Sequence, residues 1–499
     1  MSDVTPTTAK SGSRDGRPRP AVIHNRSSAV LVVRDSDYGS RHAGRRVAAT
    51  RYAGIVGQRV GHDGVGKGGQ MPLSEDDGLE VVEICAGAGG QSLGLERAGF
   101  DHRLAIELDA NAAATLKHNR PDWEVRIGDV ASPRVWDPKQ FSGVHLLAGG
   151  VPCPPFSIAG KQLGANDERD LFAWAVELCG QVRPKALLLE NVRGLSSNRF
   201  SAYRQHVLDR LHAHGYVGEW KLVHASDFGV SQLRPRFVLV ALQTEYAEHF
   251  AWPEPKLSPA PTVGETLKDL MAANGWEGAE EWAAKANDIA PTIVGGSKRH
   301  GGADLGPTRA KRRWAELAVD ALGVADTAPG AGWLPAPGAP GPKLTTEMVA
   351  RLQGWAGASE WEFTGRKTSR YRQIGNAFPP PVAEAIGRSV AKALRKEGPR
   401  QRLIEQIKPV HDPVYKLLRD AARPLSTDQI IAKLVKEGVV MQLPELERHL
   451  NHLSRDFNLV TVQRKTGASA YAIGEFKAFI GQQDHQRHDL FAQLRSKVS

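Results

Sequence analysis

The sequence is poor in cysteine and has no long apolar run. Its 499 residues contain only Cys85, Cys153 and Cys179, which form neither a disulfide framework nor a CxxC metal pair. No stretch approaches the roughly 18 to 20 apolar residues of a membrane span, and the N-terminus lacks the apolar core of a signal peptide. We therefore expect a cytoplasmic protein with no membrane partner, no disulfides and no bound metal.

A strong net charge is also missing from most of the chain. The total of +10 is concentrated in residues 1–70, where twelve Lys or Arg stand against five Asp and no Glu, and this leaves +3 for residues 71–499. The overall charge is therefore weak evidence for nucleic-acid binding by residues 71–499. Evidence for such binding must come from local clusters of Lys and Arg. A hydrophobic content of 41% allows a substantial core, and the length allows two or three domains.

The first 77 residues differ in composition from the rest. Residues 1–77 are rich in Gly, Ser, Arg and Thr and have only short apolar pieces, which predicts a disordered basic tail. A basic arm that touches nucleic acid is one interpretation. A misassigned translation start is the other, because Met71 stands a few residues before the first strong strand pattern.

From Leu79 onward, short apolar runs alternate with helical patterns. The predicted strands are 81–85, 104–108, 123–127, 144–148, 186–190, 216–224 and 237–242. The predicted helices between them end near Ala98 and span 110–119, 168–182 and 200–214. Such alternation is typical of an α/β protein with a doubly wound, mostly parallel, Rossmann-like sheet, which we assign to residues 78–242.

The alternation stops over residues 243–342. This segment carries five tryptophans, a Gly-rich basic patch at 295–302 that includes Lys298 and Arg299, and a Pro/Ala/Gly run at 328–342. The basic residues fit a solvated face, and they equally fit a loop that approaches a phosphate or a base edge. We expect a small irregular domain here.

Two further units follow. Helical patterns at 345–353 and 375–394 define the segment 343–398. Three amphipathic helices (414–421, 426–437 and 443–453) and two strands (459–464 and 470–473) then predict a winged-helix-like domain over 408–475, with Ser426 or Thr427 as a helix cap and a tail at 476–499. Protein contact is as open as DNA contact for this domain.

Cys153 stands out because its neighbours restrict the backbone. The apolar run 144–148 reads as a short buried strand that breaks at two glycines, and Pro152 and Pro154 flank the cysteine. This loop would hold one thiol just past the carboxyl end of a strand, where open α/β sheets keep their chemistry. The alternative is that Cys153 is an ordinary buried cysteine of the hydrophobic core, but a core cysteine does not need flanking prolines and glycines that restrict its backbone.

A second group of residues suits a nucleoside. The glycine-rich turn 86–90 lacks the Lys and Ser/Thr of a P-loop, and its spacing is not GxGxxG. Glu107 and Asp129 end the next two strands, where carboxylates can accept hydrogen bonds from ribose hydroxyls and an adenine amine. The pattern describes a nucleoside pocket without a pyrophosphate, which S-adenosylmethionine fits, although an acid at a strand end can also simply cap a helix.

A third group surrounds the thiol. Glu190 ends the strand after the cysteine loop, and because an ionised carboxylate raises a thiol pKa, it suits a base edge better than thiol activation. Arg234 and Arg236 stand at the start of the last strand, where guanidinium groups can reach a carboxylate or phosphate. Each could be a surface salt bridge alone, but their joint occurrence in this order argues against that.

In this order, the motifs resemble the DNA (cytosine-5)-methyltransferase family of the bacterial restriction-modification type. The resemblance covers roughly 80–242 and 343–390 and rests on residues 83–90, Glu107, 128–129, 149–157, 190–192, 232–236, 351–354 and 372–377. It implies S-adenosylmethionine as methyl donor, duplex DNA as substrate, a catalytic domain built from 78–242 and 343–398, and a target-recognition segment at 243–342.

The resemblance also implies roles. Cys153 would add to C6 of a flipped-out cytosine, so that C5 takes the methyl group, while Glu190 holds N3 and N4 with Arg236 and Arg234 assisting. The implied cofactor residues are Cys85, Ala86, Gly87, Gly89, Gly90, Glu107, Leu108, Asp129, Val130, Pro152 and Asn376. The implied DNA contacts are Ser157, Gln232, Lys298 and Arg299.

Three positions depart from the family pattern, and two other functions stay open. Cys85 stands where an aromatic residue is frequent, Glu83 where Asp is frequent, and Pro154 where Gln is common, but none of these changes removes a bond-forming group. Methylation of structured RNA and a non-catalytic DNA-binding regulator are the alternatives, and the intact Cys153 and Glu190 argue against the second. We expect a monomer that associates with the nucleoid through DNA and has a cognate restriction endonuclease as functional partner.

Overall fold

A computed structural model describes residues 78–152, 169–295, 303–397, 400, 412–464 and 469–476. The predicted N-terminal tail lies outside the described residues, and so do Cys153, Ser157, Lys298 and Arg299. The same holds for the predicted C-terminal tail beyond Phe476.

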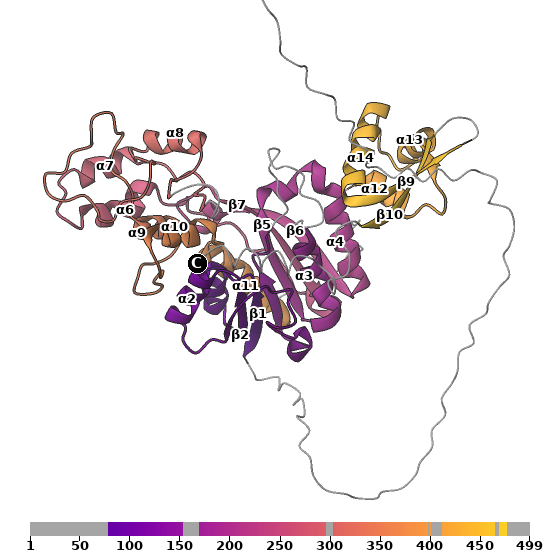
Figure 1. The fold of residues 1–499 in the computed structure, drawn as a ribbon, viewed down its shortest axis with the longest axis horizontal. Coiled ribbons are helices and arrows are strands. Elements are labelled where there is room, and N and C mark those ends of the chain that lie inside the picture. The colour runs from indigo at the N-terminus through magenta and orange to yellow at the C-terminus, as the bar shows by residue number, and fades with distance from the viewer. Residues whose placement is uncertain are drawn as a thin grey trace, which may run out of the picture.

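A seven-stranded sheet forms the centre of the molecule (Figure 1). Its strands are β1 (Leu79–Ile84), β2 (Phe100–Glu107), β3 (Val125–Ile127), β4 (Leu146–Gly149), β5 (Ala186–Val192), β6 (Tyr216–His224) and β7 (Pro235–Gln243), in the order β3-β2-β1-β4-β5-β7-β6. All neighbouring pairs are parallel except those of β7, which runs antiparallel to both β5 and β6. The predicted doubly wound, mostly parallel α/β sheet is confirmed.

Crossover helices cover this sheet because its strands are apolar on both faces. They are α1 (Gly90–Arg97), α2 (Ala110–Asn119), α3 (Arg169–Val182) and α4 (Ser201–Ala213), and α11 (Pro380–Leu394) joins them from far along the chain. A Cβ atom on Gly94 would lie 2.5 Å from the carbonyl oxygen of Pro380, so glycine permits the close packing of α1 on α11. The C-terminal segment thereby returns to the catalytic sheet.

The predicted helix 375–394 is wrong as a single element. The structure has α10 (Lys367–Asn376), then a break, then α11. Three consecutive prolines at 379–381 explain the break, because proline lacks an N–H donor and disfavours helical conformation in the residue before it.

The segment 243–342 is more regular than the sequence indicates. It contains the helices α5 (Thr244–Ala247), α6 (Val263–Ala272), α7 (Ala279–Lys285) and α8 (Thr308–Glu316), and α9 (Thr346–Leu352) follows. Trp282 and Trp314 are buried here, and their indole N–H groups donate to the carbonyl oxygens of Ala318 at 2.9 Å and Leu305 at 3.1 Å. These helices form a lobe to one side of the sheet (Figure 1), so two of the five tryptophans build its core.

The C-terminal unit, here called the winged module, has the helices α12 (Pro413–Arg419), α13 (Thr427–Lys436) and α14 (Leu443–Asp456). Its strands β8 (Leu425–Ser426), β9 (Phe457–Gln463) and β10 (Ser469–Phe476) form an antiparallel sheet in the order β8-β10-β9. The Ser426 hydroxyl accepts a hydrogen bond from the Gln429 N–H and caps α13, as predicted. The two-residue β8 was missed, since so short a strand leaves no periodic signal.

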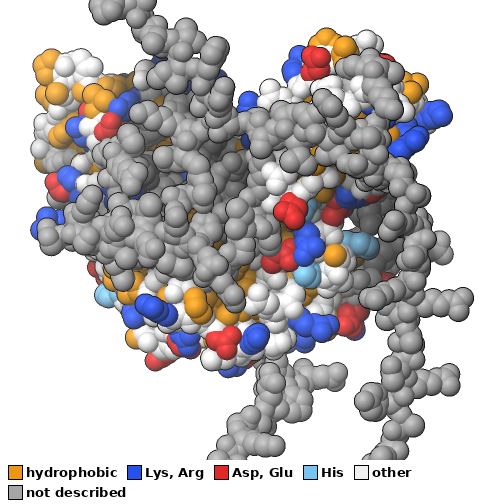
Figure 2. All heavy atoms as spheres, turned by 45° about the vertical axis from the view of Figure 1, so that its right-hand side comes forward, with side chains coloured by type: hydrophobic (Ala, Val, Ile, Leu, Met, Phe, Trp, Pro, Cys, Tyr) orange, Lys and Arg blue, Asp and Glu red, His pale blue; other side chains and the backbone are white. Residues whose placement is uncertain are grey.

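Two properties of the described surface bear on function. No helix among the described residues is long and apolar enough to cross a membrane. Where side chains are coloured in Figure 2, Lys and Arg lie scattered among Asp, Glu and hydrophobic side chains. Electrostatic binding must therefore come from local clusters.

Candidate active site

The turn between β1 and α1 needs a backbone that few residues adopt. Cys85, Gly87 and Gly89 have φ angles of 52°, 60° and 94°. Nothing lies within 4 Å of a Cβ placed on Gly87, whereas one placed on Gly89 would lie 2.1 Å from the Trp361 ring. Gly87 thus faces open space beside the turn, and Gly89 is needed for both its conformation and its neighbour. Cys85 holds the left-handed conformation without being glycine, a strain found most often at functional sites.

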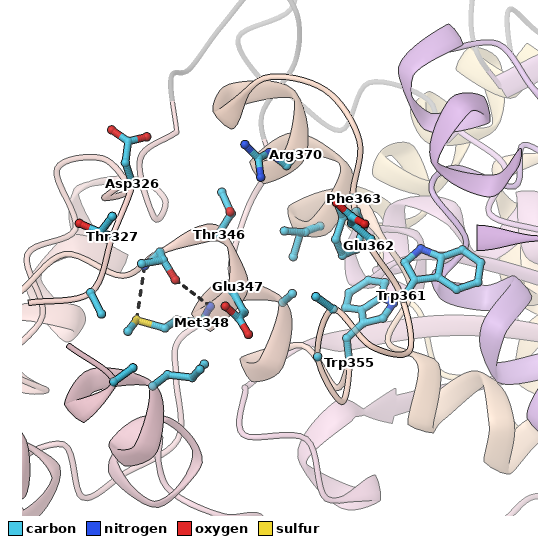
Figure 3. A pocket seen from close by; sticks show the side chains of 18 of the residues that line it. Asp326, Thr327, Thr346, Glu347, Met348, Trp355, Trp361, Glu362, Phe363 and Arg370 are labelled. Carbon is cyan, nitrogen blue, oxygen red and sulfur yellow. Dashed lines mark hydrogen bonds between the residues drawn. The ribbon is translucent and has the colours of Figure 1, made fainter. Parts of the chain in front are cut away.

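Trp361 supports this turn, and sequence reasoning missed it. Its indole N–H donates to the Ala88 carbonyl oxygen at 2.9 Å, and the Arg120 guanidinium lies 5.1 Å from the ring centre. Trp361 also borders a cavity of about 400 Å³ next to α6 and α9, where Trp355, Trp361 and Phe363 stand opposite polar rim residues (Figure 3). No predicted site residue lines this cavity, so we do not assign it to the cofactor.

Glu107 anchors the turn to the end of β2. Its two carboxylate oxygens accept hydrogen bonds from the Gly87 N–H and the Asp109 N–H, each at 2.7 Å. Burial raises the pKa of Glu107, and these two backbone donors counteract the rise. Because each carboxylate oxygen has a second lone pair, Glu107 can still accept a ribose hydroxyl.

Apolar side chains at the neighbouring strand ends complete a nucleoside-shaped surface. Leu108 directly follows Glu107, and Ile127 is the last residue of β3. Their side chains are large and apolar, yet Leu108 is 44% exposed and Ile127 is 41% exposed. Asp129 accepts a hydrogen bond from the Ala131 N–H at 3.0 Å, and Val130 is buried beneath the surface. Open space at Gly87, the hydrogen-bonded Glu107 carboxylate and the exposed apolar side chains are features that a nucleoside-binding site needs.

Strand register explains how Glu190 and Arg236 meet. In the antiparallel pair of β5 and β7, Val192 lies opposite Arg236. Glu190 and Val192 are two residues apart and share a face of the sheet, so Arg236 is the diagonal neighbour of Glu190 on that face. The Arg236 Nε and the Glu190 Oε1 lie 2.5 Å apart, and the two residues are 8% and 9% exposed.

The cysteine loop leaves the sheet beside this pair. The Asn191 side chain donates to the Val151 carbonyl oxygen at 3.2 Å. A Cβ atom on Gly150 would lie 3.6 Å from the Glu190 Oε2 and 3.7 Å from the Cys85 carbonyl oxygen. The segment after β4 therefore passes at Gly150 between the glycine turn and Glu190, and the exposed Pro152 follows two residues later.

Burial shapes the charges of both arginines. It lowers the pKa of Arg236, while the Glu190 carboxylate acts in the opposite direction. It lowers the pKa of Arg234 well below its ordinary value, and the positive charge of Arg236 adds to that effect. A guanidinium stays protonated in proteins, so Arg236 and Glu190 form a buried ion pair with no net charge.

Arg234 and Gln232 are buried against backbone groups of distant segments. Arg234 is fully buried, and its guanidinium donates to the carbonyl oxygens of Ile293 at 2.7 Å and of Gly375 and Ala377 at 2.8 Å each. Gln232 is also fully buried and accepts the Ile293 N–H at 2.9 Å. This placement joins β7 to the 243–342 segment and to α10, and the catalytic role predicted for Arg234 and the DNA contact predicted for Gln232 stay predictions.

The structure also places Asn376 and Cys179. Asn376 is exposed at the end of α10, and a Cβ atom on Gly295 would lie 2.5 Å from its Oδ1. Gly295, the last described residue before the basic patch, therefore packs closely against Asn376. Cys179 is buried in α3, and burial raises the pKa of its thiol, in agreement with the predicted core position.

Comparisons with known proteins find a matching family model, similar sequences and a structural neighbour. The family model "C-5 cytosine-specific DNA methylase" matches residues 79–392. The Type II methyltransferase M.NaeI of Lentzea aerocolonigenes is 64% identical over 427 residues, covering 84% of this chain and 99% of the relative. The Type II methyltransferase M.NgoMIV of Neisseria gonorrhoeae is 51% identical over 319 residues, covering 63% of this chain and 98% of the relative. A solved structure of a Spodoptera frugiperda DNMT2 mutant has a TM-score of 0.44 at 16% identity, covering 62% of this chain and 99% of the other.

Proposed function

The chain belongs to the C-5 cytosine-specific DNA methylase family, and on that premise we propose that Glu190, Arg236 and Cys153 surround a cytosine flipped out of duplex DNA. The observation that carries the proposal is the buried ion pair of Glu190 with Arg236. It stands where the start of the cysteine loop passes both the pair and the glycine turn.

The cysteine supplies the nucleophile. The Cys153 thiolate adds to C6 of the base, which makes C5 electron-rich, and a covalent bond joins protein and DNA until the thiolate leaves again. Release requires loss of the proton at C5 after methyl transfer. Extrusion of the base is needed because neither C5 nor C6 is accessible in the stacked duplex.

Glu190 and Arg236 act on the base. Glu190 holds the N3 and N4 edge of the base and stabilises the charge that develops on the ring as the thiolate adds at C6. Arg236 fixes the carboxylate and contacts the same ring. Because both groups are already buried and paired, little reorganisation accompanies the reaction.

Glu107, Leu108 and the turn around Gly87 would hold S-adenosylmethionine. This cofactor supplies the electrophilic methyl group to C5. Glu107 would accept its ribose hydroxyls, and the exposed Leu108 and Ile127 would contact its adenine. Pro152 and Asn376 would complete the site from the cysteine loop and from α10.

We also propose that the enzyme protects DNA against a cognate restriction endonuclease. Both relatives described above are Type II methyltransferases, which supports this partner. The monomeric state remains a prediction.

Bisulfite sequencing tests the proposed function. Plasmid DNA is incubated with the purified protein and S-adenosylmethionine and then sequenced after conversion. We expect protected cytosines at one short recognised sequence. Absence of protected cytosines, with transfer of tritiated methyl groups to tRNA instead, would overturn the DNA assignment.

A further inference from the structure

The winged module is fixed to the catalytic domain through buried polar pairs. Asp412 accepts a hydrogen bond from the Ser201 hydroxyl at 2.8 Å and lies 3.3 Å from the His449 Nδ1. Arg199 donates to Asp456 at 3.2 Å. Asp412 and Asp456 are both buried. Because ionised carboxylates are costly to bury without partners, these contacts give the module one defined position.

Aromatic packing extends the same contact. The His206 ring on α4 stacks on Phe476 with ring centres 4.5 Å apart, and Tyr203 lies 5.8 Å from Phe476. The hydrophobic core of the sheet continues into the module. The module and the sheet can therefore present one continuous surface.

The module sits at the edge of the sheet where the proposed chemistry takes place. Directly after β5, which carries Glu190, the chain forms two short 3₁₀ helices, η3 (Arg193–Ser196) and η4 (Asn198–Phe200). The Arg204 guanidinium holds this segment by donating to the carbonyl oxygens of Leu195 and Ser197, both at 2.8 Å. Arg199 of η4 is the residue that meets the module.

Helix α14 places positive charge at this contact. Leu446, Leu450 and Leu453 bury one side of the helix. Arg448, His452 and Arg455 recur every three or four residues on the opposite side and form one stripe. Both arginines are exposed and have no ion-pair partner within the described parts of the chain.

Basic side chains gather around the C-terminal half of α14. Burial lowers the pKa of His452, and the nearby charges of Arg199 and Arg455 lower it further. Asp456 pairs with Arg199 and Asp412 acts on His452 in the opposite direction, whereas Arg455 has no such partner among the described residues, and the acidic Glu445 and Glu447 lie at the other end of the helix. A cluster of this kind suits an anionic polymer better than an apolar protein surface.

We propose that Arg199, His452 and Arg455, here called the seam face, bind the phosphate backbone of duplex DNA outside the recognised sequence. The inference rests on the proposed function, because it needs duplex DNA at the Glu190 edge. The matched family domain, residues 79–392, ends before the module begins.

Two DNA duplexes of different length distinguish binding at the seam face from binding at the catalytic pocket. The long duplex carries the recognised sequence with about 20 base pairs on each side, roughly two helical turns, and the short duplex with about 4. The variant is Arg455→Glu in the full chain. The control is Lys433→Glu, an exposed residue of α13, which is the helix of the module that lies away from the sheet (Figure 1).

We expect Arg455→Glu to raise the Kd for the long duplex about 5- to 10-fold and to leave the short duplex unchanged. The slope of log K against log salt should fall by about 1, as expected for one lost phosphate contact. Lys433→Glu should match the wild type on both duplexes.

Failure of this inference is distinguishable from failure of the proposed function. Equal Kd values of wild type and Arg455→Glu for the long duplex, or equal losses on both duplexes, would overturn the seam face while the short duplex is still methylated. If the wild type methylates neither duplex, the proposed function itself fails.

Discussion

Replacement of Glu190 by glutamine tests whether the Glu190 carboxylate holds the cytosine base during the reaction. The carboxylate pairs with Arg236 at 2.5 Å, and both residues are less than one-tenth exposed. Glu190→Gln keeps the shape of the side chain but leaves the Arg236 charge buried without its partner. It also replaces an oxygen that accepts a hydrogen bond with an amide that donates one.

Two magnitudes follow. Breaking one side of a buried ion pair costs about 3–5 kcal/mol of folding free energy. Removing one preorganised group that stabilises transition-state charge costs about 2.7–4 kcal/mol, which is a factor of about 10² to 10³ in kcat. The variant should therefore be less stable and much slower, with a KM for S-adenosylmethionine close to that of the wild type, because the glycine turn and Glu107 are unchanged.

The assay is transfer of tritiated methyl groups to duplex DNA, run at a temperature where circular dichroism shows the variant folded. Glu219→Gln on β6 is the matched control, since Glu219 is exposed on the same sheet. Adding Arg236→Met to Glu190→Gln should recover part of the stability but none of the rate. A folded Glu190→Gln variant with kcat within threefold of the wild type would refute the proposed role.

Three further outcomes follow from the described contacts. Gly89→Ala should abolish cofactor binding by calorimetry or strongly destabilise the protein, because a Cβ would lie 2.1 Å from Trp361 at a φ of 94°, whereas Gly143→Ala, which also has a positive φ but no neighbour within 4 Å, should retain binding. Glu107→Gln should raise the KM for S-adenosylmethionine about 10- to 100-fold, as expected when a charged hydrogen-bond partner is lost. Because burial raises the pKa of Glu107, the KM of the wild type should also rise as the pH falls towards that raised pKa. A Glu107→Gln variant whose KM shows the same pH dependence as the wild type would contradict this. The hydrogen bond that His449 donates to Asp412 raises the pKa of His449, so its contribution to docking of the winged module is present below the ordinary histidine pKa and lost as pH rises through the raised value. The protection factors of the α14 amides, which are corrected for the intrinsic pH dependence of hydrogen exchange, should therefore be higher at acidic than at alkaline pH, and Asp412→Asn should remove the difference.

The sequence predicted the sheet because its signals are local. Apolar runs of strand length, such as 186–190, alternate with amphipathic helices, and glycines or prolines mark the turns between them. Glu107 and Glu190 could be recognised because each ends such a strand, where parallel sheets place their binding sites.

The rest depends on contacts between distant parts of the chain. Arg234 and Arg236 are two residues apart in one motif, yet one binds backbone carbonyls from residues 293, 375 and 377 and the other binds Glu190. No local pattern separates these roles. Trp361 is likewise one of eleven tryptophans, and only the fold brings it against the glycine turn.

Covalent trapping tests the central claim most directly. A duplex that carries 5-fluorocytosine at the methylated position is incubated with the protein and S-adenosylmethionine, and the denatured product is digested and analysed by mass spectrometry. Fluorine at C5 cannot leave as a proton, so the adduct persists after methyl transfer. We predict a stable protein–DNA species with the base linked to the peptide that contains Cys153, and none with Cys153→Ala. An enzyme that methylates ordinary cytosine at this position but forms no adduct through Cys153 would contradict the account.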